Sequence, residues 1–594
     1  MSEEHIHAYD FGPFRLDPVE RRLLRDGRTV PLTPKLFDIL LLLVRHSGQL
    51  VKKEELMKEI WPDTVVEENN LTVSMSMVRK ALGENRQSIR YIETVSKRGY
   101  RFVTKVRKVR SESAQATERH EMLAATEGGI KARERVISSL AVLPLANTSD
   151  DPNLEYLSDG ITESIINNLS QLPSLKVMAR STVFRYKGEK ATPVEVAREL
   201  AVRAVLVGRV LEMGDRLVVR VELVDAADGS QLWGEQYDRP LSDIFAVQGE
   251  IAHRVSEKLR LKLTSEERKR LAKRYTDNTE AYQLYLKGRY FWNKFSTEWV
   301  QKGIERFQQA IAIAPTYALA YAGLADSYFR LSDTYLPPNE ALPKAKAAAM
   351  KAVELDEELS EAHASLGLIK TYYDHDWPGA ETEYLRAIEL NPNSSIAHQR
   401  YGSYLMYLNR FQEAAAEYDL AQELDPLSLR INLGVAANMI AMGQFDRANK
   451  QLQKTLELDP NYYPAHHGLG MLRLSQGRYE ESIAEFQKAC QLESGADVSL
   501  GLMGYAYGLA GKRSEAQEIL GKLKESSARR YVSPYSFAVA HIGLGEKEQA
   551  LNYLDKLYAE RNDWLVWLNV APEFDILRSE PRFLELLRRI GFPP

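Results

Sequence analysis

A dense cluster of basic residues lies near the start of this 594-residue chain, whose overall net charge is −4. Residues 69–110 contain eleven Lys and Arg against two Glu. A local excess of positive charge inside an acidic protein is typical of a surface that binds a polyanion, whereas the alternative is a solvated basic face without a ligand. The cations are Arg79, Lys80, Arg86, Arg90, Lys97, Arg98, Arg101, Lys105, Arg107, Lys108 and Arg110.

The first part of this segment, residues 69–82, has the pattern of a helix with one apolar and one polar face. Leu71, Met75, Val78 and Leu82 recur at helical spacing, so we expect this face to lie in a core. The residues on and beside the opposite face are then free to enter the major groove of DNA. They are Asn69, Thr72, Val73, Ser76, Met77, Arg79 and Lys80.

Each residue type on the polar face suits a different contact with DNA. The hydroxyl groups can bond either kind of base, and Val73 or Met77 could pack on thymine methyl groups. Arg79 and Lys80 are expected to hold phosphates, which position a protein without reading sequence.

A basic hairpin is predicted directly after this helix. Residues 90–95 and 100–104 have the composition of short strands, and residues 96–99 (SKRG) join them. Lys97 and Arg98 would lie at the tip of the hairpin. A helix followed by a basic-tipped hairpin is the plan of a winged helix on DNA, which argues against a merely solvated basic face.

The preceding residues predict a small sheet and two more helices. Asp26-Gly27 between two apolar runs is a strong hairpin signal. Thr33 and Pro34 are typical of the N-cap and the first position of a helix. A second helix is expected over residues 52–61. Together these elements predict an α+β domain over residues 8–105.

Residues 8–105 resemble the winged-helix domains of the OmpR/PhoB type. The resemblance rests on residues 32–40 (LTPKLFDIL), 78–83 (VRKALG) and 97–102 (KRGYRF), in this order and at this spacing. It implies that double-stranded DNA is the partner, with a recognition helix in the major groove and Lys97 and Arg98 on the adjacent minor groove. Direct-repeat half-sites are typical of the family, so the resemblance also implies a homodimer on DNA.

The segment departs from the family pattern in two respects. Family members often carry arginines on the outer face of the recognition helix, where this chain has Ser76 and Met77, so a base preference cannot be carried over. Response regulators of this type also have a phosphoacceptor domain ahead of the winged helix. This chain begins with the winged helix, and we therefore expect that aspartyl phosphorylation is not its switch.

A small α/β domain is predicted after the winged helix. Residues 106–135 are rich in charged and small residues and predict a flexible linker. Strand and helix patterns then alternate over residues 136–265, which predicts a mixed sheet. This domain resembles the N-terminal domain of TolB and the domain found beside repeats in bacterial regulators and adenylate-cyclase-associated proteins. The segments that carry the resemblance are residues 140–145 (LAVLPL), 159–163 (DGITE), 205–208 (VLVG) and 232–238 (LWGEQYD).

Asp159 and Glu163 are the residues of this domain whose spacing could serve catalysis. A carboxylate pair beside Gly160 could bind a metal or a nucleotide. The same residues also suit a helix N-terminus, with Asp159 or Thr162 as the N-cap and Glu163 in the first turn. We favour this structural interpretation. The chain contains no GxxxxGK[ST] loop, which argues against a sensor ATPase.

The second half of the chain has an internal period of 34 residues. Such a period predicts an all-α solenoid of about eight tetratricopeptide repeats over residues 279–561. Residues 562–594, with Trp564 and Trp567, would form a C-terminal cap. Small residues that let paired helices approach recur at Ala380, Ala414, Ala448, Ser482, Ala516 and Ala550.

A solenoid of this kind presents a concave groove to another protein. The groove positions of three central repeats are predicted at Gln399 and Ser403, Leu433 and Ala437, and His467 and Met471. They lack the paired Lys and Asn that clamp a terminal carboxylate. An apolar or helical segment of a protein partner is therefore the expected ligand.

The composition argues against several other classes of protein. The single cysteine, Cys490, excludes an internal disulfide and a cysteine-based zinc site. The first residues lack the order of a signal peptide, and residues 136–145, the most apolar run, are shorter than the roughly 20 residues of a membrane span. We expect a cytoplasmic protein with no membrane partner, no cofactor, no metal site and no catalytic residues.

The sequence thus predicts a one-component transcription regulator with three kinds of domain. A winged helix would bind promoter DNA, a small α/β domain would follow, and the repeat array would bind a protein partner. One alternative is an interaction scaffold with vestigial DNA binding. Another is a middle domain that senses a nucleotide or another ligand.

Overall fold

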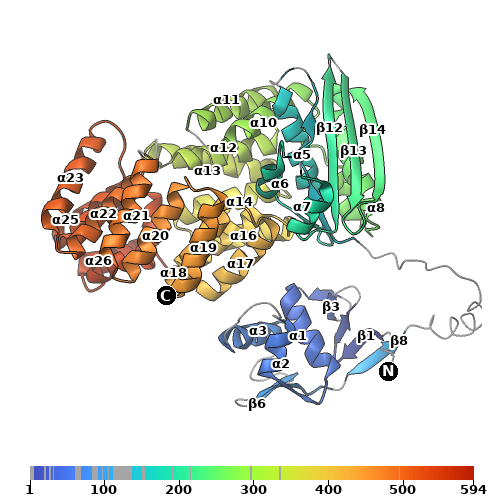
Figure 1. Cartoon of the computed structure of the whole chain (residues 1–594), viewed down its shortest axis with the longest axis horizontal. Coiled ribbons are helices and arrows are strands. Elements are labelled where there is room, and N and C mark those ends of the chain that lie inside the picture. The colour runs from blue at the N-terminus through green and yellow to red at the C-terminus, as the bar shows by residue number, and fades with distance from the viewer. Residues whose placement is uncertain are drawn as a thin grey trace, which may run out of the picture. The chain divides into compact units, whose positions relative to one another are not determined.

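The computed structural model divides the chain into two compact units, Met1–Glu134 and Arg135–Pro594 (Figure 1). Each unit is described by itself. The structure describes residues 6–18, 22–25, 28–30, 32–60, 68–82, 91–95, 98–104, 106–110, 137–149, 151, 154–189, 191–214, 216–261, 263–294, 297–332, 336–493 and 495–593.

The first unit consists of three helices and two small antiparallel sheets. One sheet has the strand order β4-β3-β2-β1-β8 and the other the order β5-β7-β6. The elements are β1 (Ile6–Phe11), β2 (Phe14–Asp17), β3 (Arg22–Arg25), β4 (Arg28–Val30), α1 (Pro34–Arg45), β5 (Leu50–Lys52), α2 (Lys53–Ile60), α3 (Glu68–Ala81), β6 (Ile92–Val95), β7 (Gly99–Phe102) and β8 (Arg107–Arg110).

The predicted start of α1 is confirmed in detail. Thr33 is the N-cap, its hydroxyl accepts a hydrogen bond from the amide of Leu36, and Pro34 is the first helical residue. The apolar face of α1 is buried together with Leu71, Met75 and Val78 of α3 in a single core. The helix that carries the candidate DNA-binding residues is thus fixed by its apolar face.

The predicted linker at residues 106–135 is wrong at its start. Arg107–Arg110 form β8, which pairs antiparallel with β1 and aligns Lys108 with Tyr9. Backbone hydrogen bonds satisfy an edge strand whatever its side chains, so a strand can form here without the apolar alternation that sequence analysis looks for. Residues 111–135 of the predicted linker lie outside the described residues.

The second unit begins with a six-stranded mixed sheet, as the alternating pattern predicts. Strands β11, β9 and β12 run parallel. Strand β13 pairs antiparallel with β12, and β14 pairs antiparallel with β13. Strand β10 pairs parallel with the other end of β12. The elements are β9 (Ser139–Val142), β10 (Ala146–Asn147), α5 (Glu155–Ser170), β11 (Lys176–Val177), α6 (Arg180–Val183), α7 (Pro193–Glu199), β12 (Ala204–Met213), β13 (Arg216–Asp225), β14 (Gln231–Pro240), α8 (Ile244–Lys258) and α9 (Ser265–Leu271).

The helices that follow form eight antiparallel pairs within the described residues. The pairs are α10 (Thr279–Trp292) with α11 (Thr297–Ile313), α12 (Ala318–Leu331) with α13 (Pro338–Leu355), α14 (Ser360–Ile369) with α15 (Trp377–Leu390), α16 (Ser395–Tyr407) with α17 (Phe411–Leu424), α18 (Leu429–Ala441) with α19 (Phe445–Leu458), α20 (Tyr463–Ser475) with α21 (Tyr479–Leu492), α22 (Asp497–Leu509) with α23 (Arg513–Ser527), and α24 (Pro534–Gly543) with α25 (Lys547–Ala559). Short helices η5 (Asp563–Asn569) and η6 (Pro572–Leu577) and helix α26 (Pro581–Ile590) end the chain.

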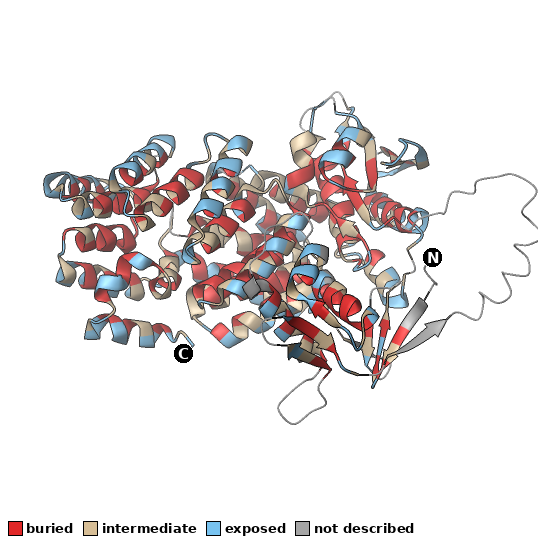
Figure 2. Cartoon of the chain, turned by 60° about the horizontal axis from the view of Figure 1, so that its bottom comes forward, coloured by how far each residue is buried: buried red, intermediate tan, exposed pale blue. Residues whose placement is uncertain are grey.

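The small residues that define the 34-residue period lie where paired helices touch. Each of Ala380, Ala414, Ala448, Ser482, Ala516 and Ala550 is fully buried. Figure 2 shows that buried residues recur along the helices of the array, beside half-buried and exposed ones. The period therefore marks close helix contacts, which only a small side chain permits.

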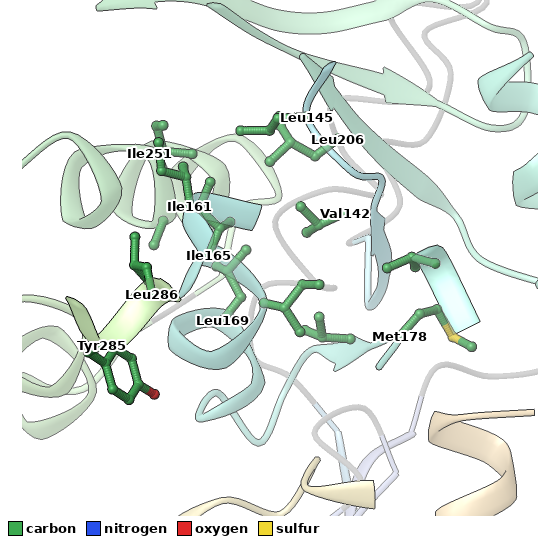
Figure 3. Close-up of a cluster of buried hydrophobic side chains, with 14 of the residues drawn as sticks. Val142, Leu145, Ile161, Ile165, Leu169, Met178, Leu206, Ile251, Tyr285 and Leu286 are labelled. Carbon is green, nitrogen blue, oxygen red and sulfur yellow. The ribbon is translucent and has the colours of Figure 1, made fainter. Parts of the chain in front are cut away.

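The middle domain and the first repeats share one hydrophobic core. Val142 and Leu206 of the sheet pack with Ile161 and Ile165 of α5, and the same cluster continues to Leu286 of α10 (Figure 3). Gly160 allows this approach, because a Cβ there would lie 2.7 Å from a methyl carbon of Leu286. The two predicted domains therefore pack as one compact unit.

In three repeats, the end of the second helix also forms a hydrogen bond or ion pair with the middle domain or the segment that follows it. Asn391 donates to the hydroxyl of Ser170 at 3.0 Å, and Lys273 pairs with Asp356 at 2.7 Å. The backbone amide of Ala179 donates to the carbonyl of Leu424 at 2.9 Å. The middle domain thus docks along one edge of the array.

Candidate nucleic-acid interface and the other predicted sites

Helix α3 separates a buried face from an exposed one, as expected. Leu71, Met75 and Val78 are buried, whereas Thr72 and Ser76 on the other side are exposed. Met77 and Arg79 are half-buried. Asn69, Val73 and Lys80 lie within the helix, and their side chains lie outside the described residues.

Arg79 is held by its own domain. Its Nη2 donates to the carbonyl of Ile92 at 3.1 Å and to the hydroxyl of Thr94 at 2.7 Å. Its guanidinium also lies 6.0 Å from the centre of the Tyr100 ring. The sequence suggests a phosphate contact for Arg79. In the structure, its guanidinium also links α3 to the β6–β7 hairpin.

The predicted hairpin is present as β6 and β7, which pair antiparallel with Val95 aligned to Gly99. Arg98 lies at this end of the hairpin and is exposed, and Lys97 lies outside the described residues. Gly99 is required by packing, because a Cβ there would overlap the carbonyl oxygen of Val51 on β5. Strand β5 pairs with β7 as far as Gly99 and therefore holds the hairpin up to its turn.

The candidate carboxylates of the middle domain occupy a different place from the one predicted. Helix α5 begins at Glu155, with Leu154 as its N-cap, so Asp159 and Thr162 do not cap it and Glu163 is not in its first turn. The capping interpretation is therefore wrong. The hydroxyl of Thr162 instead bonds the backbone amide of Leu145 at 3.0 Å.

Both carboxylates are bound by cations from other segments. Lys187 pairs with Asp159, and Glu163 forms ion pairs with Arg180 at 2.9 Å and with Arg289 of α10 at 2.6 Å. Burial alone would raise the pKa of Glu163, but the charges of Arg289 and Arg180 hold it below its usual value. Glu163 is thus an ionised structural link between α5 and the first repeat.

No sequence pattern indicates these partners. Arg180, Lys187 and Arg289 come from three separate segments, and only the folded chain brings them to α5. A charged residue in an amphipathic helix is usually solvated, so pattern analysis alone could not assign these three to a buried cluster.

Two of the predicted groove residues are buried in the array. The amide of Gln399 donates to the hydroxyl of Ser403 at 3.0 Å, and that hydroxyl contacts the hydroxyl of Tyr418 at 2.9 Å. Both residues are less than a tenth exposed. They form part of the packing between helices α16 and α17.

The other four predicted groove residues are half-buried. They are Leu433 and Ala437 of α18 and His467 and Met471 of α20. His467 bonds the hydroxyl of Ser499 at 2.9 Å, and burial lowers the pKa of its imidazole to about 4. It is therefore neutral at physiological pH and cannot act as a cation toward a ligand.

The C-terminal cap folds back onto the third and fourth repeats. Trp377 of α15 donates its indole N–H to the carbonyl of Ile590 at 3.2 Å, and its ring stacks on Phe592 at 4.8 Å. The amide of Asn569 donates to the carbonyl of Tyr407 at 2.9 Å. This contact, which we call the cap contact, covers part of the array that an open solenoid would expose.

Comparison with protein families identifies three kinds of domain in the chain. Residues 27–102 match the C-terminal domain of transcriptional regulatory proteins, and residues 136–254 match the second domain of HilA/YgeH-like transcriptional regulators. Residues 371–428 and 440–497 match the tetratricopeptide repeat. The chain therefore carries an OmpR/PhoB-type winged-helix domain, a HilA-like regulator domain and tetratricopeptide repeats.

Several known proteins are similar to parts of the chain. Transcriptional regulator HilA of Salmonella typhimurium is 25% identical over 400 residues, which cover 66% of each protein. Putative adenylate cyclase 3 of Rhizobium meliloti is 37% identical over 234 residues, or 39% of this chain and 40% of that protein. The DNA-binding domain of Escherichia coli CadC is 30% identical, with 18% of this chain covering 100% of that one at a TM-score of 0.17.

The chain spans 40% of the length of putative adenylate cyclase 3 and 66% of the length of HilA. Within the described residues, no helix has both the length and the apolar content that crossing a lipid bilayer requires.

Proposed function

We propose that this protein is a DNA-binding transcription regulator in which α3 enters the major groove of DNA. The observation that carries the proposal is the division of α3 into a face fixed in the core and an exposed face with Thr72 and Ser76. The exposed Arg98 of the hairpin would contact the adjacent minor groove, together with Lys97. Phosphate contacts from such cations supply affinity, and base contacts from α3 supply specificity.

The residues of α3 would divide the work of recognition. Thr72 and Ser76 would bond bases, Val73 and Met77 would pack on thymine methyl groups, and Asn69 and Lys80 would flank them. Arg79 would act mainly by holding the hairpin beside α3, because its guanidinium already bonds Ile92 and Thr94.

Genome-wide DNA occupancy of the full chain tests this proposal against a Lys97→Ala/Arg98→Ala variant. We expect discrete peaks for the wild type and their loss in the variant. An Arg22→Ala/Arg25→Ala variant is the matched control, because it removes the same charge from exposed residues of β3. Equal loss in both variants would indicate a general charge effect, and an absence of peaks in the wild type would favour a scaffold role for the repeats.

The repeats would bind a protein partner through their concave side. Leu433, Ala437 and Met471 are the predicted groove residues that stay half-buried and apolar, which suits a helical or apolar segment. Gln399 and Ser403 would support this surface from below rather than touch the partner. Affinity capture with a Leu433→Glu/Met471→Glu variant beside the wild type tests this role, and a partner retained by both would refute it.

We also propose that the chain is a cytoplasmic regulator without catalytic activity and that two copies bind direct-repeat half-sites. The support against catalysis is that Asp159 and Glu163 are neutralised by Lys187, Arg180 and Arg289. Isothermal titration with nucleotides and divalent metals tests the alternative of a nucleotide-sensing middle domain. A flat trace is expected, and saturable heat with any nucleotide would overturn this part of the proposal.

A further inference from the structure

One edge of the sheet in the middle domain is a long strand with a neighbour on one side. Strand β14 has ten residues, Gln231–Pro240, and among the described residues β13 is the strand that pairs with it. Figure 1 shows β14 as the outermost of the three long strands. At the opposite edge, β11 has two residues, and the amide of Ala179 just after it bonds the carbonyl of Leu424 in the repeats. The edge that can accept another strand is therefore β14.

The backbone of β14 is regular over most of its length. An edge strand carries a row of backbone N–H and C=O groups that can pair with another strand, and proteins usually protect it by shortening it or by interrupting it with a bulge or a proline. In β14 the register shift lies between Gln231 and Trp233, and Pro240 is the last residue. Residues 233–239 pair with β13 without interruption. They offer a continuous edge to a further strand.

The side chains of β14 alternate between the face that α8 covers and an open face. The α8 face is identified by Tyr237, which is buried, and by Glu235, whose carboxylate lies 4.0 Å from the guanidinium of Arg254. A strand that pairs here must match both faces. The residues of the α8 face are Trp233, Glu235, Tyr237 and Arg239, and those of the open face are Gly234, Gln236 and Asp238.

We propose that β14 pairs antiparallel with β14 of a second copy of this chain, about a twofold axis at Gln236. A twofold axis perpendicular to the sheet keeps each residue on its own face, so one residue of the strand must lie directly opposite its own copy. An axis at Glu235 would set two carboxylates opposite each other, which is unfavourable. An axis at Gln236 aligns residues 232–240, whereas an axis at Tyr237 aligns the shorter stretch 234–240.

The residues aligned by the axis at Gln236 complement each other. On the α8 face, Arg239 would lie opposite the partner's Trp233, where the guanidinium can stack on the indole, and diagonal to the partner's Glu235. Tyr237 would lie opposite the partner's Glu235, a hydroxyl donor opposite an acceptor. On the open face, Gln236 would lie opposite its own copy, where the two amides can bond each other. The charged residues of the edge therefore select this register and do not block pairing.

The pairing would join the sheets of two middle domains into one continuous sheet. Each contact would occur twice, because the interface is formed by the same strand of both copies. The pairing needs no DNA, so it goes beyond the proposed binding of two copies to half-sites. Its failure would leave the proposed DNA contact of α3 unaffected.

Oxidative crosslinking of the full chain with Gln236→Cys tests the register. Residue 236 would lie about 5.5 Å from its own copy between Cα atoms, which suits a disulfide. Asp238→Cys is the matched control, because Asp238 is exposed on the same face but its two copies would lie more than about 13 Å apart. The wild type, whose single cysteine is Cys490, gives the background.

We expect a covalent dimer from Gln236→Cys on a non-reducing gel and only background from Asp238→Cys. Equal crosslinking of both variants would indicate random collision and overturn the proposed register. A Gln236→Cys chain that stays at background would overturn the pairing itself.

Sedimentation velocity of the full chain without DNA measures the pairing in the absence of a crosslink. We expect a concentration-dependent dimer, and Arg239→Glu should weaken it by about tenfold or more, because it removes both stacking contacts and places a like charge diagonal to Glu235. Arg209→Glu is the matched control, since it makes the same charge change at an exposed residue of β12 away from the edge. A wild type that stays monomeric at every concentration, or a dimer that both variants weaken equally or that Arg239→Glu leaves intact, would overturn the proposal.

Discussion

Asp425 shows how a single carboxyl can make the contact between the middle domain and the repeats depend on pH. It follows α17, is 3% exposed, and accepts hydrogen bonds from Ser181 and from Thr182, the latter at 2.7 Å. Burial raises its pKa to about 6, although both hydroxyls lower it. The folded chain therefore holds this proton more tightly than the unfolded chain, whose Asp titrates near its ordinary value of about 3.9.

A raised acid pKa contributes stability at low pH that is lost as the pH rises through the folded value. The stabilisation by Asp425 is thus fully present below about pH 4 and gone above about pH 6. Asp425→Asn keeps hydrogen bonding without a charge, so its stability relative to the wild type should rise by about 1 kcal/mol between about pH 5 and about pH 7.5. Urea unfolding at both pH values measures this, and a pH-independent difference would contradict the assignment.

The substitution Gly160→Ala tests whether the close packing of α5 against α10 determines the stability of the fold. A Cβ at this position would lie 2.7 Å from Leu286, which is buried, so Gly160→Ala should lower the free energy of unfolding by about 1–3 kcal/mol. Gly521→Ala is the control, since Gly521 lies within α23 with open space around it and should gain about 0.5–1 kcal/mol. Thermal unfolding compares them, and equal effects would show that packing at Gly160 is not limiting.

At the residue scale, interactions between neighbours in sequence could be predicted, whereas interactions with distant segments could not. Thr33 and Pro34 capped α1 as expected, because capping involves only neighbours along the chain. Asp159 and Glu163 looked like a helix start for the same local reason. Their partners Arg180 and Arg289 come from other elements, so no local pattern could reveal them.

At the scale of elements, the arginine at the end of the β6–β7 hairpin and the arginine of α3 are expected to have different roles. Arg98 is exposed, so Arg98→Ala should leave stability unchanged and reduce the salt dependence of DNA affinity by about one phosphate contact, a slope change of about 0.9. Fluorescence anisotropy with a promoter fragment at several salt concentrations measures this slope. A slope equal to that of the wild type would remove Arg98 from the DNA contact.

Arg79 should behave differently, because it joins α3 to the hairpin. Arg79→Ala leaves the carbonyl of Ile92 and the hydroxyl of Thr94 without this donor and should cost about 1–3 kcal/mol of stability. Urea unfolding of the variant, with Arg98→Ala as control, measures the loss. Unchanged stability with a reduced salt slope would instead restore Arg79 as a phosphate contact.

The elements themselves were predictable wherever their pattern was periodic. The 34-residue period predicted the helix pairs, because each buried small residue marks one helix crossing. Strand β8 was not predictable, since Arg107–Arg110 is an edge strand without apolar alternation. A strand that is held by backbone pairing does not need alternating apolar residues, so its sequence does not show that pattern.

At the scale of the whole molecule, the cap contact distinguishes this array from an open solenoid. In an open solenoid each repeat touches only its neighbours, so a defect spreads to adjacent repeats and no further. Here Trp377 bonds the carbonyl of Ile590, which lies 213 residues along the chain. The third repeat and the C-terminal helix α26 should therefore lose protection together.

Hydrogen exchange in Trp377→Ala tests this coupling. The change removes an indole that is 2% exposed and should cost about 3–5 kcal/mol, with faster exchange both at the start of α15 and in α26. Tyr384→Ala is the matched control, because Tyr384 is a fully buried aromatic residue of the same helix. Its ring lies against Gly367 of α14 and against Tyr401 and Tyr404 of α16. It should speed exchange in its neighbours and leave α26 protected. If α26 stays protected in Trp377→Ala as well, the cap contact carries no coupling, and the array behaves as a chain of nearest neighbours.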